Sequence, residues 1–221
     1  GARFDSESYS YQYSFSDELL EEWEWSEHFS PQPDNERYLN FVADKFKLKE
    51  HIDFNARVKS ATYCSDANRW TVETENGTTK TAHFLITAVG ILSAPNMPPV
   101  PGIDSFAGTS FHTARWPKEK INLRGKRVGV IGAGASAVQL IPMIAKEVGH
   151  LTVFQREPNY CCPLRNSKIS KEEQATLKNS YQDVFEQCKK TFAGFMQDFD
   201  PRSTFDVTKG ERVAFYEKIW E

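Results

Sequence analysis

The sequence predicts an α/β fold that combines a small antiparallel sheet with a parallel βαβ unit. Residues 54–63, 69–75 and 79–89 alternate apolar and polar side chains with a period of two, which is typical of strands. Further along, a short apolar run at 126–132 is followed by a helical pattern at 134–148 and then by a second apolar run at 151–154. This order is typical of a βαβ unit, in which the two strands are parallel.

The residues before the first sheet predict one extended segment and two helices. Residues 9–15 alternate aromatic and polar side chains, which favours an extended backbone. Ser16 precedes two acidic residues, a pattern that signals the start of a helix. A second helix is expected from about Asp34 to Phe46, because its apolar residues recur every three or four positions.

Turn and linker residues divide the chain. Asp66–Asn68 and Asn76–Gly77 separate the three expected strands, and the third strand becomes fully apolar, as if it entered a buried sheet. Residues 94–102 contain four prolines, which predict a stiff connector. We therefore expect one domain at 1–98, a linker at 99–117 and a second domain at 118–221, with a helical extension from about residue 165.

Composition narrows the classes of partner. The 221 residues are 39% hydrophobic and 26% charged, as in ordinary globular proteins. The net charge of −3 argues against nucleic acid as a partner, and no apolar run is long enough to suggest a membrane span. The cysteines are too few and too irregularly spaced for a disulfide framework or a zinc site, which favours a reducing, cytoplasmic location. No obligate protein partner is evident from the sequence.

A glycine-rich turn opens the helix of the expected βαβ unit with the pattern G-x-G-x-x-A. Gly132 allows a tight turn, Gly134 lets the backbone approach a pyrophosphate at the helix N-terminus, and Ala137 lets the helix pack on the strand. The alternative is a glycine turn that only packs helix on strand. The expected nucleotide-binding residues are Gly132, Ala133, Gly134, Ala135, Ser136, Ala137, Val138 and Gln139.

The residues after the next strand bear on the choice of nucleotide. NAD sites usually place an acidic residue there, where it holds the ribose 2′-hydroxyl. Here the strand is followed by Arg156, whose guanidinium can pair with a 2′-phosphate, so we expect NADP rather than NAD. Glu157 stands next to it and argues mildly against this choice, because a carboxylate would repel the phosphate. A solvated surface arginine is the alternative.

A third motif, at residues 106–117, is much more specific. It fits F-x-G-x-x-x-H-x-x-x-W-P through Phe106, Gly108, His112, Trp116 and Pro117. It resembles the fingerprint of type I Baeyer–Villiger monooxygenases, whereas the related flavin-containing monooxygenases lack the Trp-Pro ending. Without the resemblance, the alternative interpretation of His112 is a hydrogen-bonded interface residue that packs beside aromatic side chains.

The opening residues extend this resemblance. Gly1–Asp5 looks like the end of the family's second fingerprint, which implies that Asp5 lies beside the flavin and supports an active-site arginine. The resemblance also implies that Arg3 and Phe4 flank the nicotinamide end of the cofactor, and that Tyr11 and Val58 contact FAD. Asp5 and His112 are the expected catalytic residues, with His112 between the two cofactor domains.

The resemblance covers essentially the whole chain and implies a flavoprotein with two Rossmann-like domains, one for FAD and one for NADP. NADPH would reduce FAD, and the enzyme would insert one oxygen atom of O₂ beside a ketone carbonyl to give an ester or lactone. The family's FAD pyrophosphate loop and catalytic arginine have no match here, so we interpret the chain as an internal piece of a longer oxidoreductase. The alternatives are a flavin N- or S-monooxygenase and a catalytically incomplete nucleotide-binding fragment.

Overall fold

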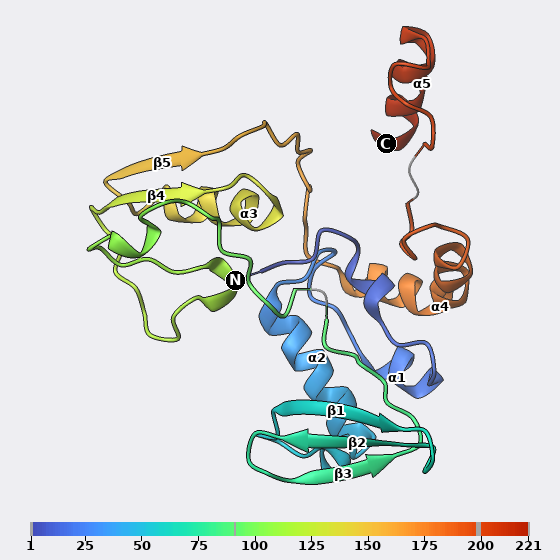
Figure 1. The fold of residues 1–221 in the computed structure, drawn as a ribbon. Coiled ribbons are helices and arrows are strands. Elements are labelled where there is room, and N and C mark those ends of the chain that lie inside the picture. The colour runs from blue at the N-terminus through green and yellow to red at the C-terminus, as the bar shows by residue number, and fades with distance from the viewer. Residues whose placement is uncertain (1, 91, 198–199, 221) are drawn as a thin grey trace. The chain divides into compact units, whose positions relative to one another are not determined.

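The computed structural model describes residues 2–90, 92–197 and 200–220, which form two compact units (Figure 1). One unit combines Gly1–Val42 with Cys161–Glu221, and the other comprises Ala43–Tyr160. The chain therefore leaves the first unit, builds the second and returns. The domain boundaries expected at residues 98 and 117 stay a prediction, because compactness does not define where a cofactor domain begins.

The first unit is built from helices. They are the short 3₁₀ helix η1 (Ser8–Tyr11) and the helices α1 (Asp17–Glu22), α2 (Gln32–Lys45), α4 (Lys171–Cys188) and α5 (Lys209–Trp220). The last turn of α2, from Ala43 on, belongs to the second unit. The predicted helix start is confirmed, since Ser16 Oγ accepts the N–H of Leu19 at 3.3 Å. The extended backbone expected for residues 9–15 is wrong at its beginning, where η1 forms.

An aromatic core holds this unit together. Trp25 Nε1 and the Tyr181 hydroxyl both donate to Gln12 Oε1, at 2.8 and 2.9 Å, so the core joins α4 to the N-terminal segment. Tyr38 packs against Trp25 and is 3% exposed. Burial raises the pKa of Tyr181 to about 12, so its hydroxyl remains protonated and able to donate.

The second unit contains the predicted antiparallel sheet, with strand order β1 (Val58–Cys64), β2 (Arg69–Thr74) and β3 (Thr79–Ala82). Gly77 at φ +85° turns β2 into β3, as the Asn-Gly pair predicts. Both antiparallel pairings are confirmed.

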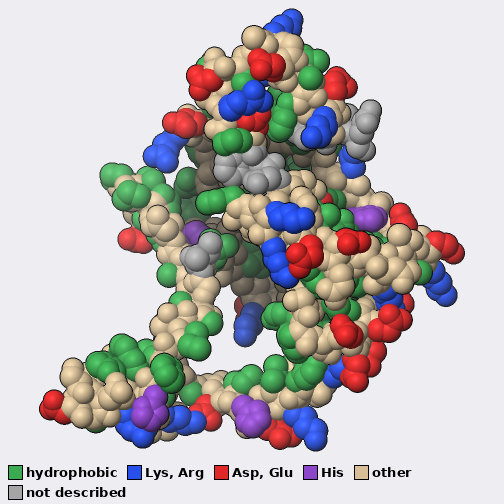
Figure 2. Space-filling model, turned by 90° about the vertical axis from the view of Figure 1, so that its right-hand side faces the viewer, with side chains coloured by type: hydrophobic (Ala, Val, Ile, Leu, Met, Phe, Trp, Pro, Cys, Tyr) green, Lys and Arg blue, Asp and Glu red, His purple; other side chains and the backbone are tan. Residues whose placement is uncertain are grey.

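The third strand is shorter than expected. It ends at Ala82, and the apolar side chains that follow stay exposed: Phe84 by 85%, Ile86 by 86% and Val89 by 75%. The prediction that the apolar run at 84–90 enters a buried sheet is therefore wrong for the described residues, because no neighbouring strand among them pairs with this run. Exposed hydrophobic side chains also occur at several places on the face drawn in Figure 2.

The predicted βαβ unit is confirmed. Strands β4 (Arg127–Ile131) and β5 (His150–Phe154) are parallel, and α3 (Ala135–Ile144) packs on them (Figure 1). Ala137 is 7% exposed within this core, where a larger side chain would separate helix from strand. Pro142 lies in the last turn of α3, and the helix ends before the expected residue 148.

The described residues contain neither a membrane-spanning helix nor a metal-binding cluster, and their charged side chains are mixed on the surface. Within the described ranges, no helix is both long and apolar enough to cross a membrane. Over the same residues, no group of three or more His, Cys, Asp or Glu side chains is close enough to hold a metal ion. Lys and Arg side chains are interspersed with Asp and Glu on the face drawn in Figure 2.

Candidate functional site

The turn between β4 and α3 requires a glycine at its first position. Gly132 has φ +106°, a backbone conformation that side chains with a Cβ rarely adopt. Its N–H donates to the carbonyl of Phe154 at 2.8 Å, which ties the turn to the end of β5. The backbone conformation of the turn is therefore sufficient to explain why position 132 is a glycine.

The second glycine has a different explanation. Gly134 is the N-cap of α3 with φ −73° and ψ −178°, which any residue can adopt. A Cβ built at Gly134 would meet no atom of the described residues within 4 Å. Neither backbone strain nor packing within the described chain requires glycine here. The open space in front of the helix matches the room that a pyrophosphate needs for close approach.

The start of α3 has the electrostatics of an anion site. No side chain caps it and its first turn carries no acidic residue. The first intrahelical bond is donated by Val138 to Gly134, at 3.0 Å. The N–H groups of Ala135, Ser136 and Ala137 therefore lack intrahelical partners, and the helix dipole adds partial positive charge there. The N–H of Val138 is already used, so a role for Val138 or Gln139 would rest on the side chain.

Asn159 is a residue of this turn that the sequence reasoning missed. Its side-chain Nδ2 donates to the carbonyl of Ala133 at 2.8 Å, which fixes the middle of the glycine turn from the loop after β5. Only its place shortly after the second strand of the βαβ unit could have pointed to it, because an isolated asparagine has no motif spacing.

Arg156 and Glu157 lie on the same edge of the sheet as the glycine turn. Ile131 pairs with Phe154 at the carboxyl ends of the two parallel strands, and the loop with both charged residues begins directly after Phe154. Both side chains are exposed, and neither makes a hydrogen bond or ion pair with another described residue. The guanidinium is therefore available for a ligand, and so is the carboxylate that would oppose a phosphate.

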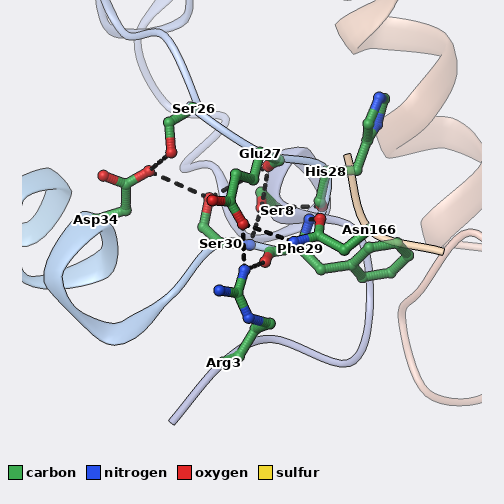
Figure 3. Close-up of polar contacts among 9 residues, drawn as sticks. All are labelled: Arg3, Ser8, Ser26, Glu27, His28, Phe29, Ser30, Asp34 and Asn166. Carbon is green, nitrogen blue, oxygen red and sulfur yellow. Dashed lines mark hydrogen bonds and ion pairs between the residues drawn. The ribbon is translucent and has the colours of Figure 1, made fainter. Parts of the chain in front are cut away.

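The N-terminal candidates lie together in the first unit. The Arg3 guanidinium forms an ion pair with Glu27 and donates to the carbonyl of Phe29 at 2.7 Å (Figure 3). Phe4 stacks on Tyr11 with ring centroids 3.8 Å apart and an angle of 4° between the planes. Asp5 is exposed between them in sequence and makes no side-chain hydrogen bond or ion pair with the residues described.

Arg3 is therefore held by its own neighbourhood, which differs from an arginine that points freely at a nicotinamide. Tyr11 is likewise engaged, since its hydroxyl lies 2.9 Å from Ser6 Oγ. Val58 belongs to the second unit, where it starts β1 and is 58% exposed. The predicted contacts of these residues with FAD and NADP stay predictions.

His112 has a defined hydrogen-bonding role. It caps the 3₁₀ helix η4 (Thr113–Arg115), because its Nδ1 accepts the N–H of Ala114 at 3.1 Å. A nitrogen that accepts carries no proton, so in the neutral ring the hydrogen lies on Nε2. The partly buried imidazole thus presents Nε2–H as a donor of fixed direction.

Two local contacts order the rest of the fingerprint segment. The rings of Phe111 and Trp116 meet edge to face with centroids 4.8 Å apart. A Cβ at Gly108 would lie 2.6 Å from the ring of Phe106, so the ring could not keep its place over any larger residue. The spacing of the motif therefore reflects local packing as well as the capping histidine.

Comparison with known proteins places this geometry in a family. A family model described as pyridine nucleotide-disulphide oxidoreductase matches residues 6–201. A 2-oxo-Δ³-4,5,5-trimethylcyclopentenylacetyl-CoA monooxygenase from Pseudomonas putida is 45% identical over 100% of this chain and 42% of its own length. An acetone monooxygenase (methyl acetate-forming) from Gordonia is 44% identical over 100% of this chain and 41% of its own length.

A solved structure is similar to this chain over nearly its whole length. The crystal structure of OTEMO in complex with FAD and NADP has a TM-score of 0.88 and 46% sequence identity, over 99% of this chain and 42% of that one. The chain spans about two fifths of the length of the curated relatives that it matches. These matches confirm the α/β two-dinucleotide flavoprotein fold and the resemblance to Baeyer–Villiger monooxygenases. The chain belongs to the pyridine nucleotide-disulphide oxidoreductase family.

Proposed function

We propose that the whole protein containing this chain is an FAD- and NADPH-dependent Baeyer–Villiger monooxygenase. It inserts one oxygen atom of O₂ beside the carbonyl of a small-molecule ketone and releases an ester or lactone. The space in front of Gly134, which the described protein atoms leave open, carries the nucleotide part of this proposal. The relative named for forming methyl acetate from acetone supports the choice of ketones.

In this proposal the glycine turn binds the pyrophosphate of NADP(H). Residues Gly132–Ala137 offer it the three N–H groups of the first turn of α3 that lack intrahelical partners, and Asn159 fixes the turn through the carbonyl of Ala133. Arg156 pairs with the 2′-phosphate from the same edge of the sheet. Glu157 weakens that pairing, so the preference for NADPH over NADH is smaller than a lone arginine would give.

The remaining candidates serve the flavin side and the linker. Asp5 lies beside the flavin and, as a charge partner, holds an arginine from another part of the protein in position. Phe4 and Tyr11 form a stacked pair that gives the Asp5 segment a rigid flank. His112 lies in the linker at 99–117, which connects an FAD domain that includes 1–98 to an NADP domain that includes 118–221. Its Nε2–H, left free to donate because Nδ1 accepts the N–H of Ala114, bonds an acceptor in one of these domains.

Bound FAD supplies the chemistry of the reaction, because reduced flavin activates O₂ and no side chain of this chain can do so. The chain's own residues bind and orient NADPH and place the Asp5 carboxylate near the flavin. This arrangement favours transfer of oxygen to the ketone over release of hydrogen peroxide. We place the protein in the cytoplasm, where NADPH and reduced thiols are kept.

A substrate panel tests this function. The purified whole protein is assayed for NADPH consumption with cyclic, linear and aryl ketones, and in parallel with amines and sulfides. Ester or lactone formed in proportion to NADPH supports the proposal. Turnover with only the amines or sulfides would assign the protein to the N- or S-oxygenating class. Bound FAD without turnover on any ketone would contradict the proposal.

A further inference from the structure

Four residues from three separate segments form a polar cluster in the first unit, which we call the clasp: Arg3, Glu27, Phe29 and Asn166 (Figure 3). Asn166 lies 139 residues after Glu27 in the sequence, yet the two side chains meet. The proposed function does not by itself explain why these residues contact one another.

The amide of Asn166 is held at both ends. Its Nδ2 donates to Glu27 Oε2 at 2.6 Å, and its Oδ1 accepts the backbone N–H of Phe29 at 2.9 Å. Arg3 reaches the same carboxylate oxygen and also donates to the Phe29 carbonyl at 2.7 Å. Glu27 is thus the shared partner of a cation from one segment and an amide from another.

Backbone bonds extend the clasp on both sides. His28 N–H donates to the Ser167 carbonyl at 3.0 Å, which pairs residues 26–29 with residues 166–169. On the other side, Phe4 N–H donates to the Ser30 carbonyl at 3.0 Å. Residues 26–31 therefore lie between the segment after the nucleotide loop and the segment that leads into Asp5.

The charges of the clasp are well satisfied. The side chains of Arg3 and Glu27 are 34% and 25% exposed. Burial raises the pKa of Glu27, but hydrogen bonds from Asn166 and Arg3 outweigh it, so the pKa lies below its ordinary value and the carboxylate stays ionised. Removing Asn166 would leave the carboxylate short of one charge-assisted hydrogen bond.

The position of the clasp in the chain suggests its task. Arg3 stands two residues before Asp5, and Asn166 stands ten residues after Arg156. We propose that Glu27 and Asn166 are positioning residues, which hold Arg3 and thereby fix the Arg3–Asp5 segment beside the flavin. This inference rests on the proposed function, since Asp5 has a flavin to face only in such an enzyme.

The pairing of a carboxylate with an amide allows a swap experiment. Glu27→Gln sets two amides against each other, and Asn166→Asp sets two carboxylates against each other. The double variant restores one carboxylate and one amide in exchanged places, and the carboxylate introduced at position 166 can still accept the N–H of Phe29. Tyr181→Phe is the matched control, because it removes a buried hydrogen bond to Gln12 in the same unit but outside the clasp.

Two readouts are taken on the whole protein with FAD bound. Hydrogen exchange of the peptide covering residues 2–6 should be about tenfold faster in each single variant, the scale of one lost charge-assisted hydrogen bond. The double variant should exchange more slowly than either single variant, as coupled neighbours do in such cycles. It should not reach the unmodified rate, because Arg3 then faces an uncharged amide at position 27. Hydrogen peroxide formed per NADPH should rise and fall in the same pattern, whereas Tyr181→Phe should leave both readouts unchanged.

The outcomes separate the two proposals. Unchanged exchange in both single variants, or a double variant as fast as the worse single one, would overturn the clasp. Faster exchange with unchanged hydrogen peroxide per NADPH would overturn the positioning role and leave the enzyme function standing. An unmodified protein that oxidises no ketone refutes the enzyme function, and the exchange pattern then decides alone whether the clasp holds residues 2–6.

Discussion

The substitution Gly134→Ala tests whether Gly134 is needed for ligand binding or for folding. The added methyl group meets no described protein atom within 4 Å, and φ −73° suits alanine. Less freedom in the unfolded chain stabilises the variant by roughly 0.4–1 kcal/mol. Alanine is a poorer N-cap than glycine by a similar amount. The free energy of unfolding should therefore change by less than about 1 kcal/mol.

The same methyl group would occupy the space proposed for the pyrophosphate. Loss of one or two charge-assisted hydrogen bonds should raise the Kd for NADP⁺ about 10- to 100-fold, or roughly 1.4–2.8 kcal/mol. Titration calorimetry with NADP⁺ and thermal unfolding of the same samples measure both quantities.

Gly132→Ala is the matched control. Its φ of +106° imposes roughly 1–3 kcal/mol of backbone strain on alanine, so this variant should lose thermal stability. Gly134→Ala that binds NADP⁺ normally would refute the assignment of the turn as a phosphate site. A Gly134→Ala protein that is as unstable as Gly132→Ala would show that the glycine serves the fold.

Five other substitutions, at four residues, test the remaining assignments. Arg156→Ala should weaken NADPH binding by roughly 2–3 kcal/mol and leave NADH nearly unchanged, whereas equal losses in a binding titration would exclude a contact with the 2′-phosphate. His112→Asn keeps an acceptor near Nδ1 and His112→Gln keeps a donor near Nε2, so the Gln variant should retain more ester-forming turnover at similar melting temperatures; the reverse order would make the cap the important feature. Asp5→Asn should still bind FAD but give less ester and more hydrogen peroxide per NADPH, and an unchanged ester yield would remove Asp5 from the site. The folded-state pKa of Glu27 is lowered, so its contribution is present above the unfolded carboxyl pKa and lost as the pH falls through the folded one. The difference in melting temperature between the unmodified protein and Glu27→Gln should accordingly shrink as the pH falls from about 6 to below about 4, and a difference that grows on acidification would reverse the sign of this argument.

Local patterns made the βαβ unit and the first hairpins predictable. The β2–β3 turn depends on Asn76-Gly77, and the pairing then follows from alternating side chains on adjacent strands. The turn after β4 follows from Gly132 and Ala137, because a tight turn and close helix–strand packing each require a small residue at a fixed spacing.

Features that depend on distant partners were not predictable in the same way. An apolar run such as 84–90 forms a strand only if other strands lie beside it, and the described residues supply none. The clasp joins Glu27 to Asn166 across 139 residues, and no periodicity links one glutamate to one asparagine. The role of His112 as a helix cap depends on the direction of its ring, and the motif gives only its spacing.

Isotope labelling tests the central claim most directly. The whole protein is supplied with NADPH, a cyclic ketone and ¹⁸O₂, and the product is analysed by mass spectrometry with fragmentation. The account predicts a lactone that carries one ¹⁸O in the ring position, an unlabelled carbonyl oxygen, and one NADPH consumed per lactone. A product without ¹⁸O, or NADPH consumption that yields only hydrogen peroxide with every ketone tried, would contradict it.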